Sequence, residues 1–363
     1  MRIGFDAKRL FLNNTGLGNY SRTLVKNLCR YHPMHEYVLY SPSAPKNSET
    51  AFFFEHDSIE IITPKSGGAL WRTFGIKKHL QEYQIDLFHG LSNELPFGID
   101  QLDLASVVTI HDVIYERYPA QYGFIDRRIY RYKTQRAITE SSKIISISEQ
   151  TTRDLETYYN GAQGKCQLIY QSCNDSFVNN IQTQNHSLET FFLSVGSVIE
   201  RKNLLRILEA MCLIPEEGRK KLIVVGEGGD YYQRCRKYAS KNGLDESVEW
   251  KGYLGKEALR ELYDTAIATI YPSIFEGFGI PVIEALYSGC PVITSNQSSL
   301  KEAGGDAAVL VDPHKPKEIA AAMIQMTRSE FRNALFQNFP AHIEKFNPEN
   351  LSSQLTELYQ SLL

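Results

Sequence analysis

Short apolar runs alternate along the chain with longer segments in which apolar residues recur at helical spacing. Strands that alternate with amphipathic helices are typical of an α/β fold, in which helices cover both faces of a parallel sheet. In the N-terminal half the pattern predicts strands at 2–6, 36–41, 58–62, 85–89, 105–110 and 143–147. It predicts helices between them at 18–31, 69–83, 124–141 and 149–158.

A second alternation begins after the polar stretch Asn179 to Glu189, which we interpret as a linker. It predicts strands at 191–196, 221–226, 248–251, 266–271, 291–294 and 308–311. It predicts helices at 203–213, 230–242, 256–264, 280–288 and 315–328. Two doubly wound Rossmann-like domains, 1–178 and 179–348, are therefore expected, with ligands at the carboxyl ends of the strands. A final helix in 349–363 has no strand after it and is expected to pack back on the N-terminal domain.

The stretch from Ala266 to Ala285 combines a strand, a loop with two glycines, and a helix that Pro281 opens. The backbone amides of Gly277 to Ile280 are then expected at a helix N-terminus, where free N–H groups and the dipole attract phosphate. Glu276 and Glu284 flank this place and suit hydroxyl groups, because a carboxylate repels phosphate. A ligand that carries phosphate between two groups rich in hydroxyls is typical of a nucleotide sugar. The alternative is an ordinary strand–loop–helix joint with surface glutamates.

Two further segments suggest contacts with an anion. Gly16 and Gly18 lie between the first predicted strand and the first predicted helix, where glycine permits close approach of a ligand. Ser21 replaces the third glycine of the dehydrogenase fingerprint, so a plain tight turn is an equal alternative. Arg201 and Lys202 follow the strand 191–196 and can neutralise a diphosphate leaving group. A solvated basic helix start is the alternative for this pair.

Two histidines follow predicted strands of the N-terminal domain. His111 comes directly after the strand 105–110, and His89 ends the strand 85–89. Because the carboxyl ends of parallel strands form one edge of the sheet, we expect both side chains to face the ligand. A buried structural histidine is the alternative.

Composition limits the partners and cofactors. The 363 residues carry a net charge of −3, which excludes a global nucleic-acid footprint. Six scattered cysteines without a CxxC pair indicate a reduced, cytoplasmic protein, and the chain enters a strand directly without a signal peptide. No apolar run is long enough to span a membrane. Because no D-x-D pair is present, we expect no metal and no other cofactor.

Taken together, these residues resemble the retaining glycosyltransferases of family 4. Glu276 and Glu284 stand at the family's E-x7-E spacing. The rest of the pattern is Gly16, Gly18, His111, Ser148, Lys202, Asn203, Ser273, Gly277, Phe278, Gly279, Pro281, Ala285 and Gly289 to Val292. The resemblance covers nearly the whole chain and implies the B-type fold, in which two Rossmann-like domains face each other across a cleft.

The resemblance also implies roles for these residues. Glu284 would bind the ribose hydroxyls, Glu276 the donor sugar, and the amides of Phe278 to Ile280 the phosphate or sugar. The implied catalytic residues are Glu276, His111, Lys202 and Arg201. The implied donor-binding residues are Gly16, Gly18, Ser197, Gly252, Tyr253, Leu254, Gly277, Phe278, Gly279, Ile280 and Glu284. Ser197 stands where many members carry arginine, and Arg201 is expected to supply that charge.

The substrates are less restricted by the sequence. The stretch Ser295 to Asp306 resembles a subgroup of bacterial mannosyltransferases for surface polysaccharides, which favours GDP-mannose as donor. A UDP-hexose or a GDP- or dTDP-deoxysugar is an alternative donor. A non-catalytic nucleotide-sugar-binding subunit, a phosphorylase and a sucrose-type synthase are alternative functions.

A predicted basic helix suggests which class of acceptor the protein binds. Residues 126–136 contain five cations and one acid, with Tyr130 and Tyr132 among them. Such a helix can approach anionic lipid head groups or an acceptor diphosphate, so we expect a glycan or lipid-linked acceptor. Peripheral attachment to the inner face of the cell membrane is the corresponding location. A solvated charged helix is the alternative.

Overall fold

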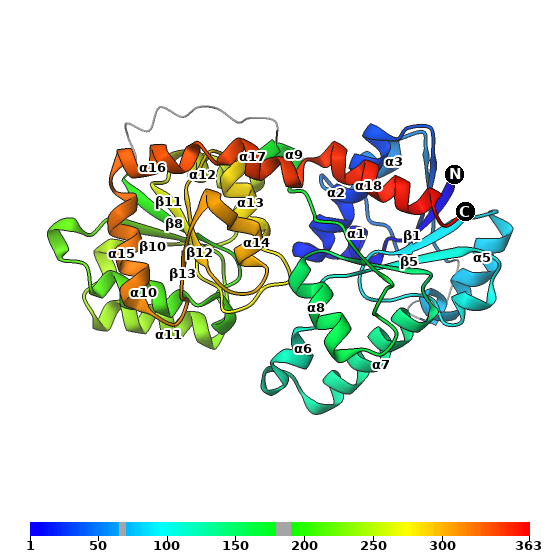
Figure 1. Ribbon diagram of the computed structural model, residues 1–363, viewed down its shortest axis with the longest axis horizontal. Helices are drawn as coiled ribbons and strands as arrows, with labels where there is room; N and C mark the ends of the chain where they lie inside the picture. The colour runs from blue at the N-terminus through cyan, green and yellow to red at the C-terminus, as the bar shows by residue number, and fades with distance from the viewer. Residues whose placement is uncertain (65–69, 179–189) are drawn as a thin grey trace. The chain divides into compact units, whose positions relative to one another are not determined.

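The computed structural model describes residues 1–64, 70–178 and 190–363. The described chain divides into two compact units (Figure 1). Unit 1 comprises Met1–Ser172 and Asn347–Leu363, and unit 2 comprises Cys173–Phe346. The expected linker, Asn179 to Glu189, lies outside the described residues.

Unit 1 is built on a parallel sheet of seven strands in the order β3-β2-β1-β4-β5-β6-β7. All six predicted strands are present in this sheet. β7 is an additional edge strand of three residues, too short and too polar to stand out in the sequence. The strands are β1 (Arg2–Asp6), β2 (Glu36–Tyr40), β3 (Ile59–Ile62), β4 (Leu87–Gly90), β5 (Ala105–Ile110), β6 (Lys143–Ser146) and β7 (Cys166–Leu168).

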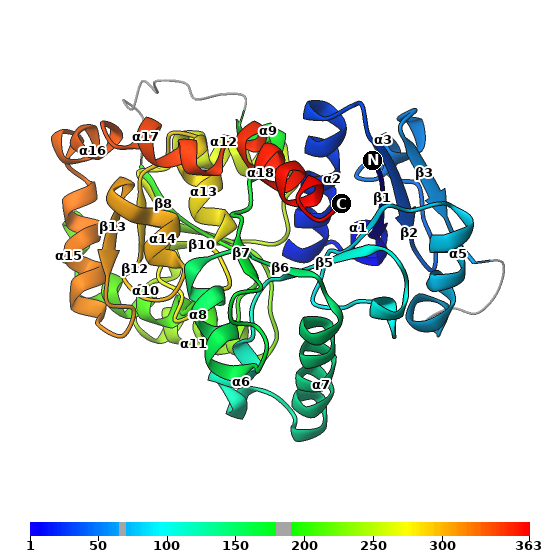
Figure 2. The ribbon, with the colours of Figure 1, turned by 45° about the vertical axis from the view of Figure 1, so that its right-hand side comes forward.

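Helices cross over between the strands of unit 1 and cover its sheet (Figure 2). The described part of the predicted helix 69–83 contains a π-helical turn, Trp71–Gly75, followed by α5. Ser148 caps α8, since its Oγ accepts a hydrogen bond of 3.0 Å from the Thr151 amide. The helices are α1 (Lys8–Leu12), α2 (Gly16–Tyr31), α3 (Ala51–Glu55), α5 (Ile76–Glu82), α6 (Ile114–Arg117), α7 (Phe124–Glu140), α8 (Glu149–Tyr158) and α18 (Pro348–Gln360).

The C-terminal helix α18 belongs to unit 1, where it lies against α2 (Figure 1). The side chain of Asn347 caps this helix by accepting a hydrogen bond of 2.9 Å from the Glu349 amide. Leu351, Leu355 and Tyr359 are buried and recur every four residues, so they form one apolar face. This apolar face of α18 packs against α2, which stabilises the final helix although no strand follows it.

The boundary between the units differs from the expected 178/179. The first segment of unit 1 ends at Ser172, and the short helix α9 (Asp175–Val178) belongs to unit 2. The ring of Phe177 packs edge-on against Tyr263, with 5.8 Å between the centroids. Arg260 donates a hydrogen bond of 3.1 Å to the Ser176 carbonyl. These contacts hold α9 on unit 2, although it precedes the polar stretch in sequence.

Unit 2 contains a second parallel sheet, with the order β10-β9-β8-β11-β12-β13. All six predicted strands of this half are present. The strands are β8 (Phe191–Val195), β9 (Lys221–Val225), β10 (Val248–Lys251), β11 (Ala268–Tyr271), β12 (Val292–Ser295) and β13 (Ala308–Val311). The longer helices are α10 (Leu204–Cys212), α11 (Asp230–Lys241), α12 (Lys256–Thr265), α13 (Ile280–Tyr287), α15 (Pro316–Met326) and α16 (Ser329–Phe336). Two shorter ones are α14 (Leu300–Gly304) and α17 (Phe339–Ile343).

Both sheets reverse their strand order at an inner pair of strands. The pair is β1 and β4 in unit 1, and β8 and β11 in unit 2. The loops after the two strands of such a pair diverge to opposite faces of the sheet and leave a crevice at the carboxyl ends, where α/β proteins bind ligands. The predicted site residues 201, 202 and 276 follow β8 and β11, so the topology of unit 2 brings their segments together.

Candidate functional site

The loop between β11 and α13 forms the centre of the candidate site in unit 2. α13 begins at Ile280, and Pro281 occupies its first turn, as the sequence predicts. Gly279 precedes the helix with φ +126°, and a Cβ there would lie 2.6 Å from Leu300 Cδ2. Glycine is therefore required both by the backbone and by the space. This turn directs the first amides of α13 toward the loop, where an anion can bind.

Glu276 is the most strongly paired side chain of this loop. Its Oε1 lies 2.7 Å from Lys202 Nζ, and its Oε2 lies 2.5 Å from an Arg201 guanidinium nitrogen. The residue is only 8% exposed. Burial by itself would raise the pKa of the carboxyl, but Lys202 and Arg201 outweigh it and hold the pKa of Glu276 below its ordinary value. Glu276 is therefore an anion between two cations.

A third polar group completes this cluster. Tyr271, the last residue of β11, donates a hydrogen bond of 3.1 Å to Glu276 Oε1, and Lys202 contacts the same hydroxyl. Sequence reasoning did not include Tyr271 among the site residues. Its position at the carboxyl end of a strand, five residues before Glu276, was the signal that could have identified it.

Lys202 and Arg201 lie in a short 3-10 turn, Glu200–Lys202, rather than at the start of α10 as expected. Asn203 separates the turn from α10 in the left-handed conformation, with φ +67°. Its side chain donates hydrogen bonds to the carbonyls of Pro272 and Pro313 at 3.0 and 2.7 Å. These bonds tie the turn to the loop after β11, which explains why both cations reach Glu276.

Glu284 lies on α13, eight residues after Glu276 in the sequence, and is partly buried. Tyr263 donates a hydrogen bond of 3.2 Å to its Oε2. Burial raises the pKa of the Glu284 carboxyl to about 7, and the Tyr263 bond offsets only part of this effect. The pKa of Glu284 is thus raised whereas that of Glu276 is lowered, so Glu284 holds its proton more tightly than Glu276 does.

The other predicted donor-binding residues of unit 2 lie at strand ends. Ser197 follows β8 and is exposed, and Gly252 and Tyr253 follow the edge strand β10. The Tyr253 side chain is 79% exposed, and Leu254 beside it is half-buried. Ser197 shares the loop after β8 with Arg201 and Lys202, whereas Gly252, Tyr253 and Leu254 belong to the separate loop after β10.

Gly16 and Gly18 occupy the first turn of α2 rather than a loop before it. A Cβ at Gly18 would lie 1.8 Å from the Asn13 carbonyl oxygen, so this glycine is required by the fold itself. The Asn13 side chain accepts hydrogen bonds from the amides of Thr15 and Gly18 at 2.9 and 3.1 Å. A Cβ at Gly16 would meet no atom within 4 Å, so only Gly16 leaves open space.

The two histidines that follow predicted strands of unit 1 are both buried, although the sequence suggested side chains that face a ligand, and only His111 keeps a small exposed part. His111 is 6% exposed, and its Nε2 donates a hydrogen bond of 2.9 Å to the Leu91 carbonyl. Burial lowers the pKa of His111 to about 4, so the ring is neutral with Nδ1 unprotonated. His89 is wholly buried and bonds to Thr109 and Tyr359, because helix α18 covers the end of β4. His89 is therefore a structural residue.

Two family models match this protein, and the regions that they match correspond closely to the two units. The model of glycosyltransferase family 4 matches residues 14–176, and that of glycosyl transferases group 1 matches residues 178–341. This chain is a family 4 glycosyltransferase. The enzyme is 25% identical to the O-antigen chain mannosyltransferase B of Escherichia coli, over all of both chains. It is 27% identical to the O-antigen chain mannosyltransferase RfbU of Salmonella typhimurium, over 67% of each chain.

Its fold also matches that of solved glycosyltransferases. A sucrose-phosphate synthase from Thermosynechococcus elongatus superposes with a TM-score of 0.79 at 20% identity, covering 100% of this chain and 99% of the other. The glycosyltransferase therefore has the expected B-type fold of two Rossmann-like domains. No helix in the described parts of the chain is long and apolar enough to cross a membrane.

The basic helix of the glycosyltransferase is less cationic than its sequence suggests. Arg127 and Arg131 lie 3.2 and 3.5 Å from Glu116, and Lys133 lies 3.1 Å from Glu94. A fourth cation of α7, residue 136, pairs with the acid at position 140. These three acids, all outside the counted stretch 126–136, reduce the local charge. The exposed residues of α7 also include apolar ones, with Phe124 70% and Ile125 71% exposed, beside exposed Asp126, Arg128 and Arg131.

Proposed function

We propose that this enzyme is a retaining mannosyltransferase that uses GDP-mannose and acts in the synthesis of a surface polysaccharide. The observation that carries the proposal is Glu276 held between Lys202 and Arg201, beside the N-terminus of α13. Two curated relatives that span the chain or two thirds of it are O-antigen chain mannosyltransferases, which favours mannose and a glycan or lipid-linked acceptor.

The proposed chemistry follows from the charges of this cluster. Cleavage of the bond between the anomeric carbon and the phosphate oxygen leaves a cationic sugar and an anionic nucleoside diphosphate. Lys202, Arg201 and the amides at the start of α13 stabilise that anion as it forms. Glu276 then accepts hydrogen bonds from the sugar hydroxyls, and His111 contacts the sugar. Retention follows if the acceptor attacks from the face that the diphosphate leaves, with the phosphate taking the acceptor proton.

A ligand screen tests the donor. Thermal unfolding is measured with GDP, UDP, ADP and dTDP and with their common nucleotide sugars, on the wild type and on Glu284→Ala. We expect GDP and GDP-mannose to raise the unfolding temperature of the wild type most, because binding to the native state alone is stabilising. A larger shift with UDP or dTDP compounds would replace mannose by another sugar. A shift with inorganic phosphate alone would favour a phosphorylase.

A transfer assay separates an enzyme from a binding subunit. Purified protein is incubated with GDP-[14C]mannose and membranes that contain lipid-linked glycan, and Glu276→Gln serves as the inactive control. We expect label in the lipid fraction with the wild type only. Binding of the nucleotide sugar without transfer in any membrane fraction would indicate a non-catalytic subunit.

We propose in addition that α7 contacts a membrane through an apolar stripe rather than through its charges. Ile125, Ile129 and Tyr132 are exposed and recur at four- and three-residue spacings, so they share one side of the helix, and the exposed Phe124 precedes them in its first turn. Arg128 lies over the Phe124 ring at 4.7 Å, at the border of this stripe. Exposed apolar residues flanked by cations are typical of helices that lie in the lipid interface.

Co-sedimentation with vesicles tests this attachment. Ile125→Ser/Ile129→Ser is compared with Arg127→Ser/Arg128→Ser/Arg131→Ser, on vesicles with and without anionic lipid and at low and high salt. We expect the double serine variant to lose binding and the arginine variant to keep most of it, with little effect of salt. Binding that high salt abolishes would restore the electrostatic interpretation. If every protein stays in the supernatant, the acceptor is soluble or reaches the enzyme without this helix.

A further inference from the structure

A chain of buried polar side chains runs through unit 1 from the C-terminal helix to His111. The hydroxyl of Tyr359 on α18 lies 2.6 Å from Nδ1 of His89 on β4. Nε2 of His89 lies 2.8 Å from Oγ1 of Thr109 on β5. The same Oγ1 lies 3.0 Å from the hydroxyl of Tyr20 on α2. These three hydrogen bonds join four elements across the core of the unit.

The ring of Tyr20 makes the last contact of this chain. It packs edge-on against the imidazole of His111, with 4.6 Å between the centroids and 89° between the planes. An edge-to-face contact of this kind favours one orientation of both rings. The hydrogen bond of His111 to the Leu91 carbonyl fixes one side of the imidazole, and Tyr20 limits rotation from the other.

The protonation of His89 determines which groups donate and which accept in this series of hydrogen bonds. Burial lowers the pKa of His89 to about 3, so the ring is neutral and carries one N–H. One of its two hydrogen bonds is therefore donated and the other accepted. The hydroxyls of Tyr359 and Thr109 must orient accordingly. Removing the Tyr359 hydroxyl leaves Nδ1 of His89 without this partner and removes the constraint that it places on the direction of the hydrogen bonds toward Tyr20.

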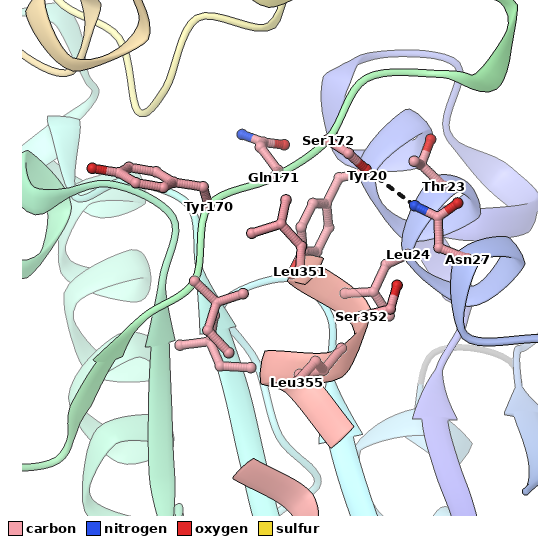
Figure 3. A pocket seen from close by; sticks show the side chains of 12 residues that line it. Tyr20, Thr23, Leu24, Asn27, Tyr170, Gln171, Ser172, Leu351, Ser352 and Leu355 are labelled. Atoms are coloured by element: carbon pink, nitrogen blue, oxygen red, sulfur yellow. Dashed lines mark hydrogen bonds between the residues drawn. The ribbon is translucent and has the colours of Figure 1, made fainter. Parts of the chain in front are cut away.

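Helix α18 also restricts the space around Tyr20. Tyr20 lines a cavity of about 30 Å³ together with Leu351 and Leu355 of α18 and Asn27 of α2 (Figure 3). A cavity of this volume has room for one or two water molecules. The bond of Asn27 to Ser172 closes one side of it at 3.1 Å. The position of Tyr20 thus depends on both the packing and the hydroxyl of residues on α18.

We propose that Tyr20 is a positioning residue for His111, and that α18 holds Tyr20 in place through Tyr359, His89 and Thr109. The inference rests on the proposed function in one respect, the contact of His111 with the donor sugar. It assigns a role in catalysis to a helix that lies at the far end of the chain and bears no residue of the candidate site.

A double-mutant cycle tests the inference. Tyr359→Phe removes one hydroxyl of the chain and keeps the ring. Thr356→Val is the matched control, because it removes a buried hydroxyl of the same helix that bonds only the Ser352 carbonyl, at 2.9 Å, among the hydrogen bonds described. Each substitution is made in the wild type and in His111→Ala, and kcat is measured at saturating donor and acceptor. Unfolding temperatures are recorded for all variants.

We expect Tyr359→Phe to lower kcat by about 5-fold in the wild type and to leave kcat unchanged in His111→Ala, because residues that act through one another are not additive. Thr356→Val is expected to change kcat in neither background. Nitrogen spectra of the histidine side chains should show a shift of the His111 signals in Tyr359→Phe and none in Thr356→Val. If Tyr359→Phe does not fold, Tyr20→Phe replaces it and is expected to behave in the same way.

Equal losses of kcat in both backgrounds would show that Tyr359 only stabilises the fold, and unchanged kcat in the wild type would show that the chain has no role. Either result overturns the inference and leaves the transferase activity in place. A His111→Ala enzyme with the kcat of the wild type would overturn the role of His111 and the inference with it. Absence of transfer by the wild type with every donor would instead overturn the proposed function.

Discussion

Donor binding is predicted to depend on pH through Glu284. Burial raises the pKa of its carboxyl to about 7 in the free enzyme. If the ribose hydroxyls donate hydrogen bonds to this group, binding selects the ionised form. About one carboxyl in eleven is ionised at pH 6, and about ten in eleven at pH 8, when the pKa is 7. The affinity should therefore fall about tenfold between pH 8 and pH 6, which corresponds to about 1.4 kcal/mol.

The same pKa predicts an effect on stability in the absence of donor. The folded pKa lies above the ordinary value of 4.5, so the unfolded chain ionises first as pH rises. The stability that Glu284 contributes is complete below pH 4.5 and is lost as the pH rises through 7. The loss is at most about 3.5 kcal/mol, from 1.4 kcal/mol per unit of pKa. Glu284→Gln, which keeps an acceptor for Tyr263, should stabilise the free enzyme more at pH 8 than at pH 5.

Calorimetric titration with the nucleotide sugar measures the first effect at constant ionic strength between pH 6 and pH 8. A nucleotide sugar is preferable to a nucleoside diphosphate, whose terminal phosphate titrates in this range. His111 and His89 remain neutral throughout, since burial lowers their pKa values to about 4 and about 3. Glu284→Gln should bind more weakly than the wild type at pH 8 and without dependence on pH. Equal affinity of the wild type at pH 6 and pH 8 would refute the reasoning.

Three further predictions concern the site and the fold. Lys202→Ala should lower kcat by about 100-fold or more, as expected for the loss of a donor to the developing anion. Arg201→Ala should lower kcat by less, because Arg201 also donates a hydrogen bond to a backbone carbonyl of the loop. Comparable losses in steady-state assays would mean that both cations contact the diphosphate. Transfer should persist in excess EDTA, and restoration of a chelated enzyme by Mn²⁺ or Mg²⁺ would contradict the metal-free mechanism. Gly18→Ala should destabilise unit 1 by several kcal/mol in urea unfolding, because a Cβ would overlap the Asn13 carbonyl; an unchanged midpoint would show that the turn before α2 can move.

Much of the fold could be predicted from the sequence. The period of apolar residues is a local property, and in strands such as 105–110 and 308–311 it matched the structure residue for residue. The turn chemistry of the segment after Tyr271 was equally local, because two glycines and Pro281 restrict the backbone wherever they occur. Short elements such as β7 and α1 were not predicted because they span too few residues to show a period.

The candidate site was predictable in its residues and not in its contacts. The positions of Glu276 and Lys202 in the chain indicated a role for both, and strand order β8-β11 then decided that they meet. Whether a charged group is ionised depends on its final surroundings. In the sequence, Glu276 and Glu284 are two glutamates that flank the same predicted loop. In the structure, cations next to Glu276 lower the pKa of its carboxyl, whereas burial of Glu284 raises the pKa of its carboxyl.

Burial itself was decided by the tertiary structure. His89 and His111 follow strands in the same way, and their sequence positions suggested exposed side chains. The structure buries both, and His89 lies under Tyr359, which is 270 residues away in sequence. The five cations of α7 suggested a charged surface, but in the structure four of them pair with acids, two of which come from other segments and one from the end of α7 itself. The sequence by itself determined the elements, because their periods and turns arise within a few residues, and only the tertiary structure decided which side chains meet, because distant segments supply their partners.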